Sequence, residues 1–428
     1  MASIPTFEYE VDYEDERIVR LLLGRLVEPE DQLFAELREH ASPAELLRAT
    51  VEDAPPPRSW PEQLAGRFRA RRTGLRLRLA RADPDADLAV GLEADARFLI
   101  PGDPQWPRTL DDLGCRAPYG LWMIGAFPPQ CPAVSMVGAR ACTGYGNQAA
   151  GQLAADLARE GAVVVSGAAI GVDGAAHRGA LAVGGHTVAV LACGIDRSYP
   201  ATHAALIQAI GQRGAVLAEL PPGTTPARFR FLARNRLIAA LGLGTVVVEA
   251  ALRSGSLVTA HQAAELGRAV FAVPGPVTSS QSTGTNRLLS DGAVPALDGA
   301  QVLAELGIEL RRQGRAAVGP SSGPLERPRI EAPAQGPPGP RQSTSAPSLP
   351  PSAAARCAPT RSFRDAVATD PVTVLVREAL PTVRSGRAAE VLELAAETGL
   401  EPGRVLASLG LLAARGQAIK TGRGWALG

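Results

Sequence analysis

Residues 162–177 read AVVVSGAAIGVDGAAH. The first four residues are apolar without interruption, a Ser-Gly pair follows, and a helical stretch begins near Asp173. A continuous apolar run is typical of a strand that is buried on both faces, as in a parallel sheet. A strand, a glycine turn and a helix in this order predict one unit of an α/β fold.

The same unit recurs along the middle of the chain. Five of its apolar runs are followed by helical stretches, which begin near Tyr145, Asp173, Thr202, Arg228 and Leu257. Helices that cross between buried strands favour an extended Rossmann-like, doubly wound parallel sheet, with its core at residues 131–305. The predicted strands lie in AVSMVGA (133–139), AVVVSG (162–167), TVAVLACG (187–194), AVLAEL (215–220), TVVVEA (245–250) and AVFAVPG (269–275).

The segments around this core differ in composition. Residues 1–96 predict an N-terminal helical domain, in which Ser42-Pro43 marks one helix start. The sheet domain spans residues 97–312 and opens with a connector rich in proline and tryptophan, which has one short strand at 121–124. Residues 313–362 are rich in proline and serine, which predicts a disordered linker.

Residues 363–428 predict a winged helix, because three short helical units precede a hairpin turn at 421–424. In a DNA-binding winged helix, the third helix would contact the bases. Its apolar residues suit a core helix equally well, so the sequence leaves open base contact, partner binding and a pure packing role. These apolar residues are Val405, Leu406, Leu409, Leu411 and Leu412.

The charge of the chain is nearly balanced. A net charge of +1 over 428 residues means that any basic site must be local. Lys420 is the only lysine, so nearly all the positive charges are arginines. A guanidinium group can bind a phosphate through two hydrogen bonds and can stack on an aromatic ring. A run with seven arginines at residues 67–81 suits either a nucleic-acid face or a solvated helix side, and we favour the second.

Cysteine usage and hydropathy bear on location. The five cysteines form no C-x-x-C pair, which favours reduced thiols. The N-terminus lacks the apolar core of a signal peptide, and no uncharged run reaches membrane-spanning length. We expect a cytoplasmic protein.

Glycine and hydroxyl residues follow the predicted strands, at the edge where parallel sheets bind ligands. Gly138-Ala139-Arg140 follows the first strand and Ser166-Gly167 ends the second. Small residues let backbone N–H groups approach an anion, and helix N-termini favour phosphate. Neither G-x-G-x-x-G nor a P-loop is present. The pattern therefore predicts an extended phosphate-binding edge that is not a dinucleotide site.

Signals for catalysis are weak. We expect Asp173 to cap a helix and Glu249 to pair with an arginine, although an enzyme of this fold could use either one as an acid. We expect no catalytic residue, no metal and no cofactor. Four histidines have no metal-ligand spacing and are expected to be structural: His177, His186, His203 and His261.

Residues 228–236 read RFRFLARNR and begin the helix after the fourth strand. Arginines at a positive helix end repel one another unless anions compensate them. Internal carboxylates would do so, and so would a run of phosphates, with Phe229 or Phe231 stacking on a base. Arginines and aromatic rings together predict a single-stranded nucleic acid track. The arginines in question are Arg228, Arg230, Arg234 and Arg236.

At these residues the chain resembles the DNA-processing protein A (DprA, also called Smf) family. The resemblance runs through VGARACTGYG, VVSGAAIGVDGAAHRGAL, VLACGIDRSYP, RFLARNRLIAAL, VVVEAALRSGSLVTAHQAAELGRAVFAVPG and GTNRLLSDGA. It implies a SAM-like N-terminal domain and a Rossmann-like domain that binds single-stranded DNA without sequence preference. It also implies a homodimer that protects incoming strands during natural transformation. Such proteins help load RecA recombinase onto strands coated by single-strand-binding protein, and they are not known as enzymes.

The resemblance also implies site residues. Phe231, Arg234 and Asn235 match the F-P-x-R-N motif of the family, with Leu232 in place of its proline, and His203 stands where asparagine is common. Together with the residue pattern, this gives a predicted DNA-binding set. Its members are Arg140, Gly138, Gly167, Gly171, Arg228, Phe231, Arg234, Asn235, Arg236, Ser254, Gly255 and Ser256.

Two other functions compete with this one. An enzyme could bind or hydrolyse a small nucleotide in the same cleft, and Glu249→Gln would then remove turnover. Alternatively, the chain could be a scaffold in which residues 363–428 bind DNA.

Overall fold

The computed structural model describes residues 11–308 except 53 and 129, together with residues 376, 380, 389–398, 405, 408, 409, 412, 418–421 and 424–427. The predicted linker at 313–362 lies outside the described residues, and the domain boundaries stay predictions. Within the described part, no helix is long and apolar enough to cross a membrane.

The described residues of the N-terminal part form five helices, and polar side chains begin most of them. Asp15, Asp31 and Asp83 accept backbone N–H groups at helix starts, and Ser42 forms a reciprocal capping box with Glu45. The predicted helix start at Ser42-Pro43 is therefore confirmed. The helices are α1 (Glu16–Leu26), α2 (Gln32–Leu37), α3 (Pro43–Val51), α4 (Glu62–Leu79) and α5 (Pro84–Glu93).

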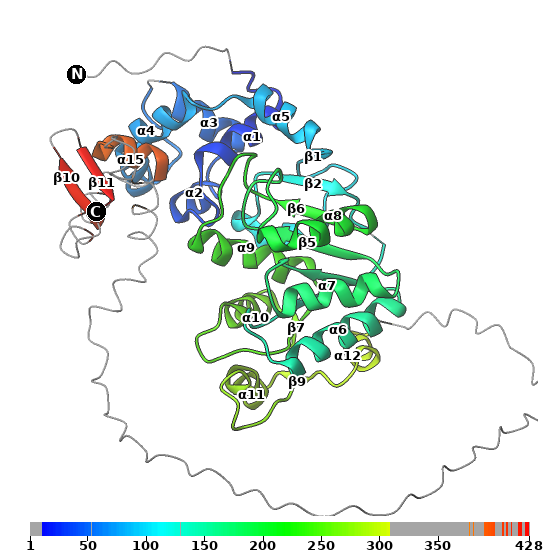
Figure 1. The fold of residues 1–428 in the computed structure, drawn as a ribbon. Coiled ribbons are helices and arrows are strands. Elements are labelled where there is room, and N and C mark those ends of the chain that lie inside the picture. The colour runs from blue at the N-terminus through cyan, green and yellow to red at the C-terminus, as the bar shows by residue number, and fades with distance from the viewer. Residues whose placement is uncertain are drawn as a thin grey trace, which may run out of the picture. The chain divides into compact units, whose positions relative to one another are not determined.

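A nine-stranded sheet follows, in the order β1-β2-β6-β5-β4-β3-β7-β8-β9 (Figure 1). Strands β3 to β9 are parallel, and β2 and β1 extend the sheet antiparallel beyond β6. The six predicted strands, the short strand at 121–124 and the doubly wound topology are confirmed; β1 and β9 were not predicted. The strands are β1 (Ala96–Leu99), β2 (Leu121–Gly125), β3 (Ala133–Val137), β4 (Val163–Ser166), β5 (Thr187–Leu191), β6 (Ala215–Ala218), β7 (Gly244–Val247), β8 (Ala269–Ala272) and β9 (Val294–Pro295).

Helices link these strands, and each predicted helix start lies within two residues of an observed one. A 3₁₀ turn (η2, Ala201–His203) precedes α8, and another 3₁₀ segment (η1, Arg108–Arg116) lies in the connector before β2. The helices are α6 (Gly144–Arg159), α7 (Val172–Ala182), α8 (Ala204–Arg213), α9 (Arg228–Leu241), α10 (Gly255–Glu265), α11 (Thr283–Ser290) and α12 (Gly299–Glu305).

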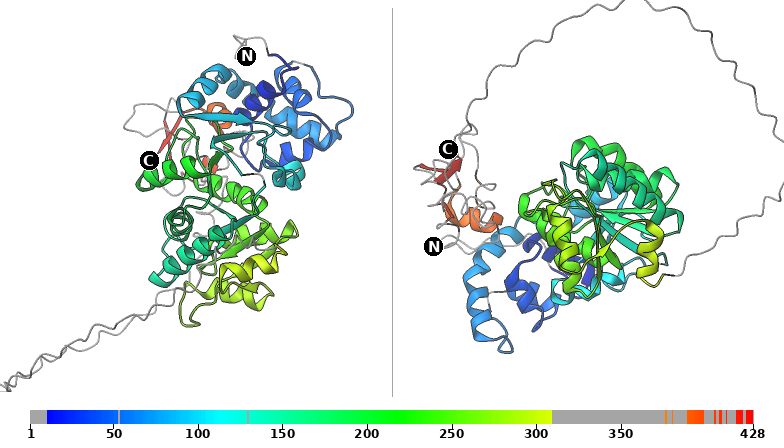
Figure 2. Two further views of the ribbon diagram at one scale, coloured as in Figure 1. Left: turned by 90° about the vertical axis from the view of Figure 1, so that its right-hand side faces the viewer. Right: turned by 90° about the horizontal axis from the view of Figure 1, so that it is seen from below.

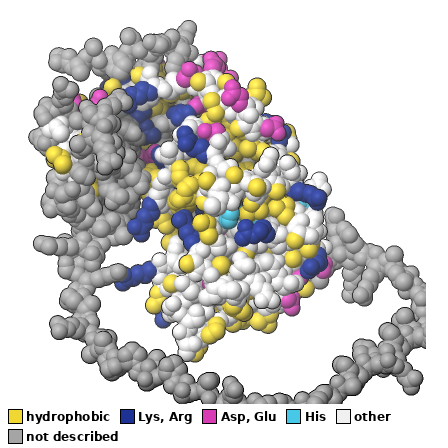
Figure 3. Space-filling model, in the orientation of Figure 1, with side chains coloured by type: hydrophobic (Ala, Val, Ile, Leu, Met, Phe, Trp, Pro, Cys, Tyr) yellow, Lys and Arg dark blue, Asp and Glu magenta, His cyan; other side chains and the backbone are white. Residues whose placement is uncertain are grey.

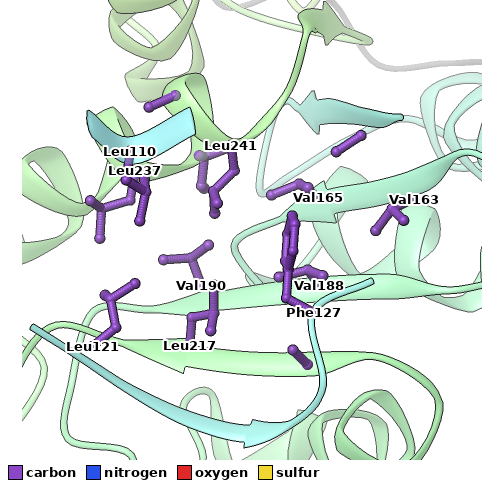
Figure 4. Packing of buried hydrophobic residues seen from close by; sticks show 14 of the residues in the cluster. Leu110, Leu121, Phe127, Val163, Val165, Val188, Val190, Leu217, Leu237 and Leu241 are labelled. Carbon is purple, nitrogen blue, oxygen red and sulfur yellow. The ribbon is translucent and has the colours of Figure 1, made fainter. Parts of the chain in front are cut away.

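Helices cover both faces of the twisted sheet (Figures 1 and 2). In β4, Val163 and Val165 pack with Leu237 and Leu241 of α9 (Figure 4), whereas Val164 packs with α6 and α7 on the other face. Successive side chains of a strand point to opposite faces. A strand that is covered on both sides must therefore be apolar at every position, which explains the continuous apolar runs.

The described residues near the C-terminus include helix α15 (Val391–Thr398) and an antiparallel hairpin of β10 (Ala418–Thr421) and β11 (Gly424–Leu427). The predicted hairpin is confirmed. Val405, Leu409 and Leu412 are buried in a small apolar cluster, which supports a packing role for these three side chains. Leu406 and Leu411 lie outside the described residues, and the winged helix as a whole stays a prediction.

Candidate nucleic-acid interface

A cleft of about 970 Å³ lies at the carboxyl edge of the sheet. It is located where β3 and β7 are neighbours, with Val137 paired to Val247 in register. The chain continues from β3 to one side of the sheet and from β7 to the other, so the loops that follow these two strands diverge here. Ligands of doubly wound folds bind at such a switch point.

The loops after β3 and β7 and the first turns of α9 and α10 line the cleft. Nine of the twelve residues predicted to bind DNA are among its lining residues. They are Gly138, Arg140, Arg228, Phe231, Arg234, Asn235, Ser254, Gly255 and Ser256.

Phe231 is the aromatic centre of the cleft. The guanidinium of Arg140 lies over its ring at 4.6 Å from the centroid, and the ring of Tyr199 lies 5.5 Å away at 52°. Arg140 is exposed and Phe231 half-buried, so both are accessible from the cleft. A guanidinium beside an accessible ring offers one site for a phosphate and one for a base.

Arg234 forms the floor of the cleft and is only 6 % exposed. It donates hydrogen bonds to the carbonyl oxygens of Gly167 and Val190, and its Nε has no partner among the described residues. Burial lowers the pKa of Arg234 to about 10, which still leaves it charged at neutral pH. The neighbouring Asn235 donates to the carbonyl oxygen of Gly255 and so ties α9 to the start of α10.

Three predicted glycines are needed because parts of the protein itself approach them closely. A Cβ at Gly167 would collide with the guanidinium of Arg234, and one at Gly138 would collide with Val172. Gly171 has a φ of +89° and lies against the backbone of Ala139 and Arg140. These glycines bring the loops together and so place Arg140 and Arg234. Of the three, Gly138 also lines the cleft.

The helix ends around the cleft differ in their capping. Among the described residues, no side chain caps the first turn of α9, whereas the Ser254 hydroxyl caps α10. Free N–H groups at the positive end of α9 favour an anion.

Glu249 lies near the cleft but acts on a different helix. Its carboxylate accepts hydrogen bonds from the N–H and hydroxyl of Thr143 at the start of α6. The expectation that Glu249 pairs with an arginine is therefore wrong, because this carboxylate stabilises a helix start.

Asp173 is also held by the backbone. Its carboxylate accepts N–H groups from Gly167 at 3.2 Å and Ala169 at 3.4 Å, in the loop before α7. Burial raises its pKa, and the nearby Arg234 opposes that rise. Asp173 therefore orders the loop, whereas Gly171 occupies the N-cap position of α7 that we expected Asp173 to serve.

Positive charge dominates the cleft. Its lining contains Arg140, Arg228, Arg234 and Arg253 against one carboxylate, Asp173. Within the described ranges, none of these arginines has a carboxylate oxygen at ion-pair distance. In the view of Figure 3, Lys and Arg side chains lie among hydrophobic ones across the middle of the molecule, and many of the carboxylates lie toward its upper edge.

Two of the four arginines at the start of α9 are compensated by internal carboxylates, the alternative to phosphates that the sequence left open. Arg230 pairs with Glu28 at 2.7 Å. Arg236 is 2 % exposed and pairs with Glu219 at 2.6 Å and Glu30 at 3.2 Å. Arg236 does not line the cleft, and the structure removes it from the candidate site. Glu28 and Glu30 follow α1 and lie some 200 residues from their arginines along the chain, whereas Glu219 lies just beyond β6.

The arginine run at residues 67–81 lies on α4 and just beyond it. Several of its members pair with carboxylates, including Arg67 with Glu36 and Arg71 with Asp31. Arg67 is exposed, as on a solvated helix side, whereas Arg71 is largely buried in its pair, and the preference for a solvated helix side stays a prediction. Arg78 and Arg81 have different surroundings, because both line a separate groove.

His177 is fully buried and held in its neutral form. Its Nε2 accepts the N–H of Ala168, and its Nδ1 lies 2.7 Å from the hydroxyl of Thr187, which itself donates to Val164. Burial lowers its pKa to about 3. His203 and His186 also bond backbone carbonyls. These contacts bear out the expected structural role for all three.

This burial predicts a pH effect on stability. In the unfolded chain His177 takes up a proton near pH 6.5, whereas in the folded chain it stays neutral down to about pH 3. The free energy of unfolding should therefore fall by about 1.4 kcal/mol per pH unit below pH 6.5. Urea unfolding at pH 7.5 and pH 5 measures the effect. The free energy of unfolding that is lost between these two pH values should be about 2 kcal/mol smaller in His177→Gln than in the parent protein. The exposed His261→Gln is the control, and an unchanged pH response of His177→Gln would contradict the assignment.

Among the aromatic rings and arginines that line the cleft, sequence reasoning missed Tyr199 and Arg253. Both lie in loops that follow strands, in CGIDRSYP and EAALRSGS. Their position at the carboxyl edge was the available signal, because this edge carries the binding residues of the fold. No His, Cys, Asp or Glu cluster suited to a metal gathers within the described residues.

Residues 97–307 match the family model described as DNA recombination-mediator protein A. The chain is also similar to an X-ray structure of DNA processing protein A from Streptococcus pneumoniae, with 32 % identity and a TM-score of 0.56. This similarity covers 69 % of the present chain and 99 % of that one. The chain belongs to the DprA family. The predicted resemblance is thereby confirmed, and the match spans the whole cleft.

Two further relatives are similar to parts of the chain. A putative DNA processing protein DprA of Mycobacterium tuberculosis is 48 % identical over 239 residues, which cover 52 % of this chain and 60 % of that protein. DNA processing protein A from Helicobacter pylori, which binds single-stranded DNA, is 33 % identical with a TM-score of 0.45, covering 49 % of this chain and 95 % of that one. The matches thus span about 60 % of the length of the curated relatives.

Proposed function

We propose that the cleft binds single-stranded DNA without regard to sequence. The observation that carries the proposal is the pair of Arg140 and Phe231, which places a cation and an accessible ring side by side in the cleft. Four arginines against one carboxylate leave an excess of positive charge, which the phosphates of a polynucleotide would neutralise.

Single strands fit better than duplex. A base can stack on Phe231 only when it is unpaired and turned toward the protein, and every base has a face that can stack. Guanidinium groups on the phosphates carry no sequence information. Binding that combines stacking with phosphate contacts is therefore sequence-tolerant.

Arg140→Ala should weaken oligo-dT binding about tenfold or more, since a hydrogen bond between charged groups is worth about 1.5–3 kcal/mol. The slope of log affinity against log salt should also become shallower by about 0.7 for each phosphate that the variant no longer neutralises. Fluorescence anisotropy across a salt series measures both quantities.

Arg159→Ala is the matched control for that experiment. Arg159 is exposed at the C-terminal end of α6, away from the carboxyl edge of the sheet, and it pairs with Asp156. Equal losses of affinity in Arg140→Ala and Arg159→Ala, or binding that does not respond to salt, would refute the proposal.

The alternative, an enzyme that acts on a small nucleotide, uses the same cleft. In that case mononucleotides should displace oligo-dT at micromolar concentration, and Glu249→Gln should remove turnover. The structure weakens this alternative, because the Glu249 carboxylate is occupied at the start of α6 and does not line the cleft.

The family likeness supports the wider part of the proposal. In this wider proposal the protein is a cytoplasmic homodimer that protects incoming single strands during natural transformation. It also helps load RecA onto strands coated by single-strand-binding protein. The DNA-bound protein should then shorten the lag of RecA filament formation on coated strands. A lag that the protein leaves unchanged would limit the function to strand binding.

A further inference from the structure

We propose that the single-stranded DNA track continues from the cleft into a second groove, where the arginine run of the N-terminal part contacts further phosphates. This inference rests on the proposed function of the cleft. The second groove has a volume of about 290 Å³, and its lining includes Arg25, Arg78, Arg81, Thr224, Thr225 and Arg230.

The second groove has more positive charge than its own carboxylates neutralise. Arg78 and Arg230 share one partner, Glu28, at 3.8 and 2.7 Å. The Nη1 of Arg78 is buried and has no partner among the described residues. Burial lowers the pKa of Arg78, and the nearby Arg230 adds to that effect.

The other two arginines of the second groove differ from each other. Arg25 is neutralised by Asp87 and donates to the carbonyl oxygen of Pro222. Arg81 is exposed and has no partner in the described part of the chain. Four guanidinium groups are thus neutralised by only two carboxylates, Glu28 and Asp87. The excess positive charge lies at Arg78 and Arg81.

The second groove and the cleft share one structural boundary. The loop between β6 and α9 lines the second groove with residues 223–225 and the cleft with Pro226 and Ala227. At the start of α9, Arg228 lines the cleft and Arg230 the second groove. Residues two apart in a helix project about 200° from each other, so this turn presents a cation to each side. A strand that leaves the cleft needs to cross only this loop.

Helix capping explains part of this arrangement but not all of it. Arginines in the last turn of a helix stabilise its negative end, which accounts for Arg78 at the end of α4. Arg81 lies beyond the helix, is exposed and has no carboxylate at ion-pair distance within the described residues. An open groove with threonine hydroxyls, the incompletely neutralised Arg78 and an Arg81 that is unpaired within the described residues fits the backbone of an extended polyanion.

The test compares two oligonucleotide lengths in the full chain. Oligo-dT of about 6 nucleotides fits within one single-strand site, and oligo-dT of about 20 nucleotides extends beyond it. In Arg81→Ala, binding of the long oligonucleotide should fall roughly 3- to 10-fold, and its salt slope should become shallower by about 0.7. Binding of the short oligonucleotide should not change.

Arg69→Ala is the matched control, because Arg69 belongs to the same arginine run, pairs with Glu62 and does not line the second groove. Unchanged binding of the long oligonucleotide by Arg81→Ala would overturn the inference while leaving the proposed function intact. Equal weakening for both lengths would also overturn it, since it indicates a general charge effect. Failure of Arg140→Ala to weaken either length would instead refute the proposed function.

Discussion

Replacing Phe231 by alanine should weaken the binding of single-stranded oligonucleotides by about 5- to 150-fold, because stacking of one base on a ring is worth about 1–3 kcal/mol. Phe231 is the ring on which both Arg140 and Tyr199 converge in the cleft. The substitution also removes the surface that holds the Arg140 guanidinium in place. Fluorescence titration with oligo-dT at fixed salt measures the fall in affinity.

Phe229→Ala is a closely matched control. Phe229 lies two residues earlier, is half-buried and stacks with Arg230, but it does not line the cleft. Its removal should leave the affinity nearly unchanged. If Phe229→Ala and Phe231→Ala weaken binding equally, the ring in the cleft is not the base platform. The salt slope of Phe231→Ala should stay close to that of the parent protein, since Phe231 has no charge with which to neutralise a phosphate.

Arg236→Ala should have the largest effect on stability, lowering the free energy of unfolding by about 3–5 kcal/mol. Arg236 is 2 % exposed, and its removal leaves Glu219 without its nearest cation. The carbonyl oxygens of Arg116 and Ala233 would also each lose the hydrogen bond that Arg236 donates. Urea unfolding monitored by circular dichroism measures the change, and oligo-dT affinity of the folded protein should stay near that of the parent.

Arg287→Ala serves as the stability control, since its pair with Asp291 is exposed on α11 and should contribute only about 0.3–0.5 kcal/mol. If Arg236→Ala does not fold, Glu219→Gln tests the same pair and should destabilise the protein without weakening DNA binding. A stable Arg236→Ala that no longer binds oligo-dT would return Arg236 to the binding site and contradict the structure.

Helical geometry could have grouped three of the cleft residues of α9 in advance, but not Arg234, which lines the cleft although it is four residues after Arg230. Positions 228, 231 and 235 are three and four apart, so they share one face of a helix, and all three line the cleft. Arg230 projects to the opposite side and meets Glu28. What periodicity could not supply is the carboxylate itself, because Glu28 lies in a different part of the chain and reaches Arg230 only after folding.

Sequence alone determined the parallel sheet and the edge at which its ligand site lies. These follow from local rules: a strand covered on both faces must be apolar throughout, and small residues must follow it where loops meet. Only the tertiary structure decided which arginines are free. Charge compensation depends on distances between residues far apart in sequence, as between Arg236 and Glu30, so the same side chain becomes a structural ion pair or a binding group according to where the fold places the nearest carboxylate.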